Sequence, residues 1–389
     1  MKKVNPLLIV ILAIGVFGII TTEMGIIGVL PQVTQKFNIS TSQAGWLVSI
    51  FSLVVAISGP FLTLLASGIN RKAILLTAVF IFAISNIVYA YTTMFDVMLI
   101  FRIIPAIFHP VFFSVALVTA VQLVPPEKST NAVTKVFAGI TVGFAFGVPL
   151  TSYLADKISL EVAFLFGAVV SIIAFVGILT WLPSMPVKEK MSYGKQLGIL
   201  RKPQLWLNIV TVIFIFAAMF SVYSYFAEYL GQVTHMNGSW ISIMLMTFGI
   251  IMIFGNFLFG SLLQKSITKT VIMFPLLYAV TYLFVYYLGS YFIPTVMIVL
   301  IWGIVHSGGL IISQAWLTNE AKEAPEFGNS LFISFSNLGI TIGTSIGGWF
   351  ISHLGIHQLI WSGIMFAVFA FLGIMIKVKI TKSNVMKGT

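Results

Sequence analysis

The chain has 389 residues, of which 59% are hydrophobic and only 8% are charged, and its formal net charge is +11. A soluble domain carries about 25% charged residues, so this composition excludes a soluble globular protein and predicts an integral membrane protein. The absence of cysteine excludes disulfide bonds and thiolate metal sites. No polar stretch is long enough to form a basic domain of its own, so the positive charge does not indicate a nucleic-acid partner.

Apolar segments of roughly 20 residues, the length that an α-helix needs to cross a bilayer, follow one another along the chain. The pattern predicts an all-α polytopic membrane protein with twelve transmembrane helices. The expected spans are 7–31, 44–68, 73–92, 96–121, 131–155, 161–182, 205–230, 239–264, 270–289, 292–318, 327–352 and 357–377. The first apolar run is too long for a secretory signal peptide, so we interpret it as the first span.

A polar, basic stretch bounded by prolines at 183–204 divides the expected spans into two groups of six. We therefore predict an N-terminal six-helix lobe at 1–182, a cytoplasmic linker at 183–204 and a C-terminal six-helix lobe at 205–389. The sequence LPQVT at 30–34 ends the first span, and LGQVT at 230–234 ends the seventh. This match at equivalent places indicates an internal duplication and hence two pseudo-symmetric lobes.

The basic residues fall mainly at the termini and in alternate loops. If the N-terminus is inside, the outer loops hold only Lys36 and Lys157. Cytoplasmic loops are enriched in Lys and Arg, so this bias predicts a multi-pass protein of the cell membrane with both termini in the cytoplasm. The lysines beside the anionic inner leaflet also account for the net charge.

Short motifs occur in four places, in chain order. The first span contains TEMGIIGVLP at 22–31, the loop after the second span reads GPFLTLLASGINRKAILL at 59–76, and the fourth span contains FRIIPAIFHPVFF at 101–113. Glycines spaced by four residues, which permit close helix contact, recur in the fifth and eleventh spans. The residues singled out as conformational motifs are Gly59, Arg71, Lys72, Gly139, Gly143, Gly147, Pro149, Gly343 and Gly347.

These stretches together resemble the major facilitator superfamily, and most closely its twelve-helix drug–proton antiporter and sugar-efflux branch, which includes arabinose efflux permeases. The resemblance covers nearly the whole chain. It implies a monomeric secondary transporter that alternates access to a site between its lobes and exports its substrate in exchange for protons. It also implies that Gly59 allows close helix contact and that the Arg71–Lys72 pair caps a helix end. No cofactor is expected beyond the proton gradient.

Glu23 is the only ionisable side chain in the first apolar run. A charge in the bilayer costs about 2.5 to 3.5 kcal/mol, so such a residue faces the bundle interior or a water-filled passage and has a partner. Counting residues from the expected span ends places Glu23 and Arg102 at similar depths. We therefore predict an ion pair between them, with Glu23 exchanging its partner for a proton. The alternative is a purely structural role for the carboxylate.

Two further side chains are candidates for proton coupling. His109 lies in the fourth span, where a membrane histidine also serves as a hydrogen-bonded packing residue. Glu228 lies near the outer end of the seventh span, where the alternative is that it reaches the lipid headgroups.

Aromatic residues are abundant in the spans, with 35 Phe, 12 Tyr and 8 Trp. An aromatic cavity with few polar groups suits an amphipathic organic molecule or drug. The predicted cavity residues are Tyr223, Tyr225, Phe226, Trp302, His306, Gln314 and Asn337. The asparagine and glutamine side chains leave sugars, nucleosides or purines as alternative substrates.

An enzyme or a sensor is the alternative of another class. No nucleotide-binding loop and no regular metal-ligand spacing occur in the sequence, so neither ATP hydrolysis nor a metal site is expected. Glu320, Glu323 and Glu326 form the one acidic cluster in a loop, which we interpret as solvated. The predicted protein is therefore a transporter and not an enzyme.

Overall fold

The computed structural model describes residues 6–66, 69–125, 128–186, 198–323 and 325–387. Within these ranges the chain is helical, without strands, and twelve helices are long and apolar enough to cross a membrane. The predicted fold class is confirmed. The elements are α1 (Pro6–Phe37), α2 (Thr41–Ala66), α3 (Arg71–Tyr91), α4 (Phe95–Gln122), α5 (Ser129–Val142), η2 (Gly143–Gly147), α6 (Val148–Lys157), α7 (Leu160–Trp181), η3 (Gly198–Arg201), α9 (Pro203–Tyr223), α10 (Phe226–Gln232), α11 (Gly238–Lys265), α12 (Ile267–Leu288), α13 (Phe292–Thr318), α14 (Pro325–Leu354), η4 (Ile356–Gln358) and α15 (Leu359–Lys387).

The linker predicted at 183–204 lies partly outside the described residues, which omit 187–197. After this gap, η3 leads directly into α9, which begins at Pro203. Proline is favoured in the first turn of a helix because the amide it lacks has no partner there. Residues 67–68 of the loop motif also lie outside the described part of the chain.

Side-chain caps fix where several helices begin. A side-chain oxygen at each of these positions accepts a hydrogen bond from a main-chain N–H of the first turn, which would otherwise lack a partner. These caps are Asn70 for α3, Ser159 for α7, Asn237 for α11 and Ser266 for α12.

Two of the predicted spans are interrupted rather than continuous. The fifth consists of α5, the π-helical turn η2 and α6, and the seventh consists of α9 and α10. Pro149 follows η2 and has no N–H to donate back to the carbonyl of Ala145, so regular α-helical bonding fails there. In the seventh span, the Ser224 hydroxyl at the break bonds to the Thr344 hydroxyl at 2.7 Å. π-Helical turns such as η2 are found frequently at functional sites.

The two halves pack their equivalent helices in the same way. A Cβ atom added to Gly139 or Gly143 would overlap atoms of α1, and one added to Gly343 or Gly347 would overlap atoms of α9. Gly147 likewise abuts α1. The fifth span therefore lies tightly on the first, and the eleventh on the seventh, because glycine lets the helix backbones approach. This shared packing gives the predicted pseudo-symmetry a structural basis.

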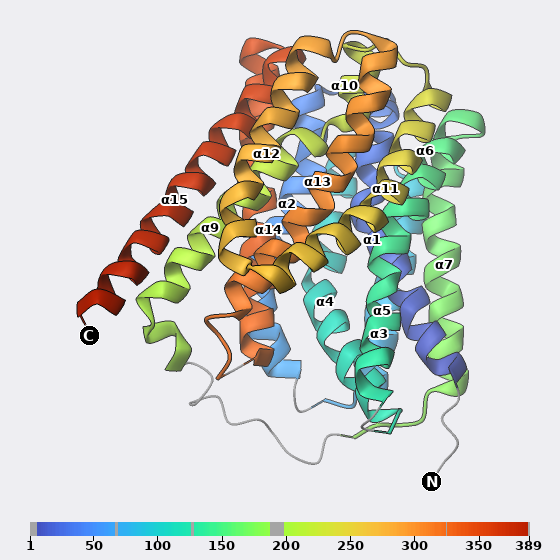
Figure 1. The fold of residues 1–389 in the computed structure, drawn as a ribbon. Helices are drawn as coiled ribbons and strands as arrows, with labels where there is room; N and C mark the ends of the chain where they lie inside the picture. The colour runs from blue at the N-terminus through green and yellow to red at the C-terminus, as the bar shows by residue number, and fades with distance from the viewer. Residues whose placement is uncertain (1–5, 67–68, 126–127, 187–197, 324, 388–389) are drawn as a thin grey trace.

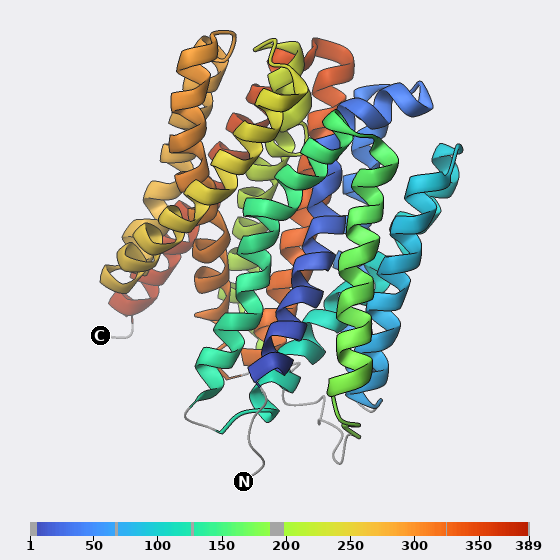
Figure 2. The same ribbon diagram turned by 90° about the vertical axis from the view of Figure 1, so that its right-hand side faces the viewer.

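The two halves of the chain meet most closely at the end remote from the termini. Figures 1 and 2 show both termini at one end of the bundle, and the helices of the two halves diverge toward that end. Among described residues, four side-chain hydrogen bonds join the halves, and all lie toward the opposite end. They are Thr41–Glu228 at 3.0 Å, Ser242–Ser152 at 3.1 Å, Ser239–Asp156 at 3.3 Å and Thr341 to the Ser49 carbonyl at 3.3 Å.

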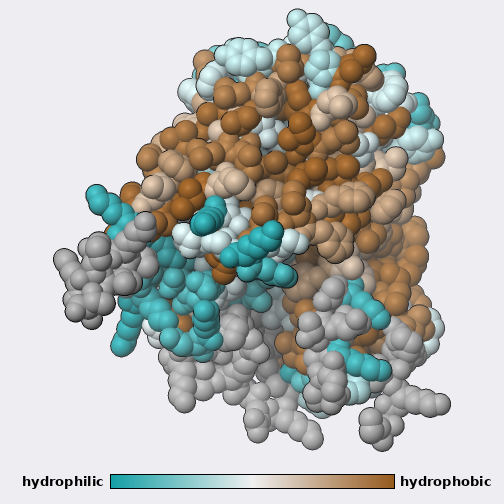
Figure 3. Space-filling model, viewed as in Figure 1, coloured by the Kyte–Doolittle hydropathy of each residue, from teal (hydrophilic) through white to brown (hydrophobic). Residues whose placement is uncertain are grey.

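Near the end that carries the termini, the ion pairs between described residues stay within one half. Lys202, directly before α9, binds Glu323 at 2.7 Å, and Lys377 binds Glu320 at 2.8 Å within the C-terminal half. Figure 3 shows hydrophobic residues over the middle of the visible face and hydrophilic ones toward this end. The molecule is thus a multi-pass membrane protein in which the side-chain hydrogen bonds between the halves lie toward the face remote from the termini.

Candidate functional site

Arg102 of α4 is buried, with 1% of its surface exposed. Its guanidinium donates three hydrogen bonds to main-chain carbonyls: Nε to Leu47 at 2.9 Å, Nη1 to Thr22 at 2.8 Å and Nη2 to Glu23 at 3.0 Å. The group also lies 4.5 Å from the ring centre of Phe51. Arg102 therefore ties α4 to α1 and α2.

The predicted ion pair between the Glu23 and Arg102 side chains is not formed. The guanidinium reaches the main chain of Glu23, and the Glu23 carboxylate instead lies with Oε2 3.0 Å from Nε2 of His109. The exposed fractions are 4% for Glu23 and 5% for His109, so the pair is shielded from both lipid and bulk water in this conformation. The contact lacks hydrogen-bond geometry and is an ion-pair approach between a carboxylate and an imidazole, two groups that titrate.

Rings hold the imidazole of His109 in place. Its centre lies 5.8 Å from that of Phe51 and 4.7 Å from that of Phe113. Both ring nitrogens, Nδ1 and Nε2, are buried without a hydrogen-bond partner among described residues, although Nε2 lies 3.0 Å from the Glu23 carboxylate. A buried polar atom left without a partner is costly, which is typical of a functional rather than a structural site.

A second layer of residues that the sequence analysis did not identify supports the pair. Pro105 has no N–H for the Phe101 carbonyl, and the Tyr89 hydroxyl donates to that carbonyl at 2.7 Å. The Asn86 amide donates to the Thr22 hydroxyl at 2.8 Å, next to Glu23. These contacts fix α1, α3 and α4 against one another around the carboxylate.

The Glu23–His109 pair lies close to the boundary between the halves. Pro110, the next residue after His109, is 3.6 Å from the position of a Cβ at Gly59. The atom nearest to that position is the hydroxyl of Ser334 in α14, at 2.6 Å. Gly59 thus allows α2 to contact α14 closely, in agreement with the resemblance.

Arg71 and Lys72 bind within the N-terminal half. The Arg71 side chain bonds to Gln122 of α4, and Lys72 Nζ donates to the Leu179 carbonyl at 2.8 Å. The residue four positions after Leu179 is Pro183, which cannot donate a helical hydrogen bond. Lys72 therefore caps the C-terminal end of α7, as the resemblance implies.

In the C-terminal half, four of the predicted cavity residues form one packed cluster. The ring of His306 lies 4.7 Å from that of Tyr223, and the ring of Phe226 lies 4.8 Å from that of Trp302. Their exposed fractions are 1% or less. Tyr278, which the sequence analysis missed, accepts a hydrogen bond from Trp302 at 2.9 Å and bonds to His306 Nδ1 at 2.7 Å. In this conformation the rings fill the space themselves and do not line an open cavity.

The other predicted cavity residues lie apart from this cluster. The Tyr225 hydroxyl donates to the Thr344 carbonyl at 2.9 Å, and its ring packs against Gly45 of the other half. Gln314 donates to Asn329 at 3.1 Å. Asn337 donates to the carbonyl of Ile333 in its own helix at 2.9 Å, while its Oδ1 has no partner among described residues.

Glu228 does not reach the lipid headgroups. It is 6% exposed and lies at the boundary between the halves, where its Oε1 accepts hydrogen bonds from Thr41 at 3.0 Å and from Gln232 at 2.6 Å. After the break, α10 packs against α1, and Tyr225 and Glu228 contact α2, so a residue near the span end is buried. Glu228 and Glu23 therefore belong to two separate sites.

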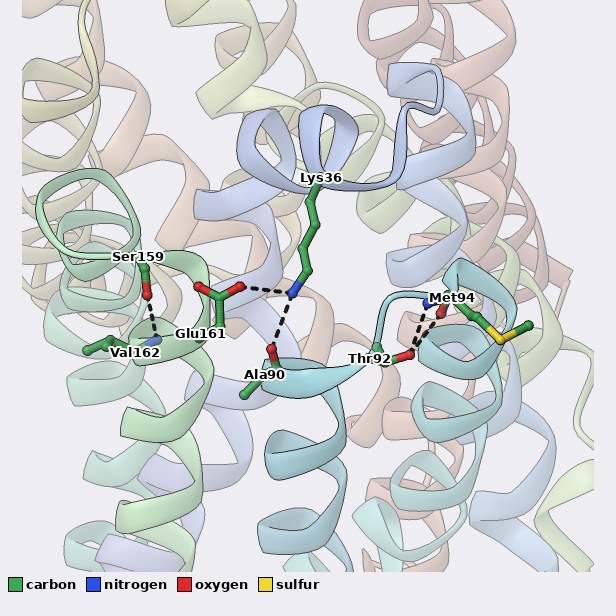
Figure 4. Close-up of polar contacts among 7 residues, drawn as sticks. All are labelled: Lys36, Ala90, Thr92, Met94, Ser159, Glu161 and Val162. Atoms are coloured by element: carbon green, nitrogen blue, oxygen red, sulfur yellow. Dashed lines mark hydrogen bonds and ion pairs between the residues drawn. The ribbon is translucent and has the colours of Figure 1, made fainter.

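Lys36 ties together three helix ends of the N-terminal half at the face remote from the termini (Figure 4). Its Nζ lies 3.1 Å from Glu161 at the start of α7 and 3.2 Å from the Ala90 carbonyl at the end of α3. Lys157, the other lysine predicted for the outer loops, lies 3.2 Å from Asp156. Both are in ion pairs, so this face presents little free positive charge.

The sequence profile described as Major Facilitator Superfamily matches residues 12–326. The chain belongs to this superfamily. Its members are transporters and not enzymes, so the alternative of a membrane enzyme is set aside.

The sequence is 31% identical over 351 residues to the inner membrane transport protein YdhP of Escherichia coli (strain K12), covering 90% of each chain. It is 23% identical over 366 residues to the purine ribonucleoside efflux pump NepI of Shigella sonnei, covering 94% of this chain and 92% of NepI.

The fold is similar to a bacterial homologue of the human lysosomal transporter Spinster, solved in an inward-facing and unoccupied conformation. The TM-score is 0.79 at 18% identity, and the match covers 97% of this chain and 98% of the other. This likeness supports the twelve-helix architecture.

Proposed function

We propose that the protein exports small amphipathic organic molecules across the cell membrane in exchange for protons. The observation that carries this proposal is the buried Glu23–His109 pair, 3.0 Å apart, beside the boundary between the halves. A titratable pair inside a membrane bundle marks a proton or substrate pathway.

Proton exchange changes the charge of this pair by one. When the imidazole carries a proton on both nitrogens, the positive imidazolium compensates the negative carboxylate and the pair is neutral. After proton loss the pair keeps one negative charge in a low-dielectric interior, which favours a polar or cationic substrate at the boundary. Substrate and proton would thus compete, which is the requirement for antiport.

The two halves would act as lobes that rock against each other around this boundary. The distribution of basic residues supports cytoplasmic termini, and the closed face then lies outside the cell. The conformation described here is in that case inward-facing. The four hydrogen bonds between the halves must break when the outer face opens.

Export driven by a pH gradient in proteoliposomes tests the role of the carboxylate. We expect Glu23→Gln to abolish uphill transport, because the amide keeps the side-chain size but cannot bind the exchanged proton. Glu161→Gln is the matched control, since Glu161 also pairs with a base but is 43% exposed at the surface. If Glu23→Gln exports at the wild-type rate with the same pH dependence, the carboxylate is structural.

The natural absence of cysteine allows a direct test of the rocking motion. The hydroxyls of Ser152 and Ser242 are 3.1 Å apart across the halves, and those of Ser224 and Thr344 are 2.7 Å apart within one half. We expect oxidation of the Ser152→Cys/Ser242→Cys pair to stop transport and reduction to restore it. The Ser224→Cys/Thr344→Cys pair should leave transport active when oxidised. Full transport with the cross-half bond in place would contradict the proposal.

A second candidate is export of nucleosides. The similarity to NepI favours it, as do the amide side chains of Gln314, Asn329 and Asn337, which could bind hydroxyl groups. Counterflow with labelled nucleosides, sugars and lipophilic amines separates the two substrate classes. Saturable exchange of nucleosides alone would favour the second candidate.

A further inference from the structure

A cavity of about 530 Å³ lies between the halves at the face remote from the termini, separate from the Glu23–His109 pair. Ligand pockets commonly have volumes of about 300–1,000 Å³. Helices α1 and α6 form one side, and α10, α11 and the turn between them form the other. The lining residues are Gly28, Pro31, Gln32, Thr34, Gln35, Ser152, Ala155, Asp156, Glu228, Gly231, Gln232, Met236, Gly238 and Ile241.

The charges that line this cavity are both negative. They are Asp156 and Glu228, and no lysine, arginine or histidine lines it. Asp156 is compensated, since it lies 3.2 Å from Lys157 and accepts a hydrogen bond from Ser239. Glu228 has no basic partner among described residues, so the cavity wall retains one uncompensated carboxylate.

The hydrogen bonding of this wall is also incomplete. The Oε1 atom of Glu228 has two donors, Thr41 and Gln232, but its Oε2 atom is buried without a partner among described residues. The Oε1 atom of Gln32 is also buried without a hydrogen-bond partner among described residues. A buried acceptor without a donor costs about 1 to 3 kcal/mol, and more for a charged group. Both residues line the cavity, although the two oxygens themselves are covered, so a ligand that supplies N–H donors and a positive charge reaches them once these side chains rotate.

We propose that this cavity is a binding site for a small organic cation bearing a primary ammonium group. The ammonium would pair with Glu228 and donate to the unpartnered oxygens, while Pro31, Met236 and Ile241 would contact the apolar part of the ligand. Because both halves line the cavity, an occupant bridges them and holds this face closed. Bound ligand therefore stabilises the conformation described here, independently of proton coupling at Glu23.

Thermal unfolding of the purified protein, followed by tryptophan fluorescence with increasing butylammonium chloride, tests the site. A ligand that binds only the folded state raises the unfolding temperature in a saturable way. We expect saturable stabilisation of the wild type, and weaker effects of butan-1-ol, which lacks the charge, and of tetramethylammonium, which lacks N–H donors. Equal stabilisation by all three compounds would show general solvent effects and overturn the proposal.

Variants of the lining residues test whether butylammonium binds in this cavity. Glu228→Gln should weaken the apparent affinity for butylammonium by at least about tenfold, because it removes the uncompensated charge. Glu161→Gln, at the same face but outside the cavity, should bind as the wild type does. Gly231→Leu keeps the carboxylate and fills the cavity; a Cβ there is 3.6 Å from Ile241, so the helix tolerates a side chain. Undiminished affinity in both Glu228→Gln and Gly231→Leu would refute the site.

Glu23→Gln separates this proposal from the proposed function. The variant should bind butylammonium with wild-type affinity, since Glu23 does not line the cavity. Loss of transport with binding retained would support both proposals. Loss of butylammonium binding in this variant would show that the two sites are one and would contradict the inference.

Discussion

The N-terminal half places charged groups where the C-terminal half places neutral ones. The LPQVT and LGQVT matches align Glu23 with Tyr223, and His109 and His306 stand at the same distance from the starts of α4 and α13. Glu23 Oε2 is 3.0 Å from the His109 ring nitrogen, whereas the Tyr223 and His306 rings pack 4.7 Å apart. One helix frame thus surrounds a carboxylate–imidazole pair in one half and an aromatic cluster in the other.

The same contrast recurs in the contacts that support each centre. Arg102 binds three main-chain carbonyls in the N-terminal half, and the neutral Tyr282 hydroxyl binds the Ala218 and Met219 carbonyls in the C-terminal half. In the register that matches His109 with His306, Val299 of α13 stands where Arg102 stands in α4, so the equivalent place in the C-terminal half carries no charge. We infer that the charged groups of the N-terminal half serve transport.

The largest expected effect concerns the two histidines. His109→Gln should reduce proton-driven transport by about a hundredfold, since positioned proton-transfer groups contribute effects of this size. His306→Gln should leave proton-driven transport close to that of the wild type, because its partner is a tyrosine hydroxyl. Transport by the two variants in the same proteoliposomes checks this. An equal loss of transport in the two variants would contradict the prediction that only the N-terminal histidine takes part in proton coupling.

Replacing the groups that bind main-chain carbonyls should have the next largest effect. Arg102→Met should lower the free energy of unfolding by about 3 to 5 kcal/mol, because several buried carbonyls lose their donors. Tyr282→Phe should cost about 1 kcal/mol, the usual size for a neutral hydrogen bond in a membrane bundle. Denaturant unfolding in the same detergent compares them. If Tyr282→Phe and Arg102→Met lowered the free energy of unfolding equally, the charge of Arg102 would make no contribution to stability.

Substitution of equivalent glycines should destabilise the two halves equally, since these glycines form the helix contacts that the halves share. At Gly139 and Gly339 an added Cβ would lie 2.5 Å from the Ala13 carbonyl oxygen of α1 and 2.6 Å from the Ile213 carbonyl oxygen of α9, respectively. Each substitution by Ala should therefore cost about 1 to 3 kcal/mol through overpacking. Thermal unfolding of both variants measures the two costs. A large difference between them would show that the frames are not equivalent.

The smallest expected effect is at the outer helix ends. Lys36 binds the Ala90 carbonyl at the end of α3, and Thr234 binds the Gly289 carbonyl after α12 at 2.7 Å. Lys36→Met should cost about 0.5 kcal/mol or less, because Lys36 and Glu161 are partly exposed. This cost should shrink at high salt, whereas that of Thr234→Val should not. Unfolding at two salt concentrations separates them.

The sequence was sufficient to predict the fold but only part of the site. The apolar runs, basic loops and glycine spacing each follow from the physics of the bilayer, so the twelve spans and the pseudo-symmetry could be predicted. The partner of Glu23 could not, because counting residues gives the depth of a side chain but not its direction around the helix axis. Arg102 has a long side chain that reaches carbonyls instead of the carboxylate.

The aromatic cluster illustrates a second limit. Trp302 and Tyr223 could be proposed, but Tyr278 and Tyr282 could not be distinguished from the other aromatic residues, which occur throughout the chain. A usable signal was nevertheless present. The equal spacing of His109 and His306 from their helix starts marks the centres of both halves once the internal duplication is accepted.

Proton movement measured directly is the sharpest test of the central claim. Proteoliposomes loaded with a pH-sensitive dye are given a transported substrate, without an imposed gradient, and the internal pH is followed. We expect substrate-dependent proton flux in the wild type and in Tyr223→Phe, and none in Glu23→Gln. Proton flux in Glu23→Gln equal to that of the wild type would contradict it.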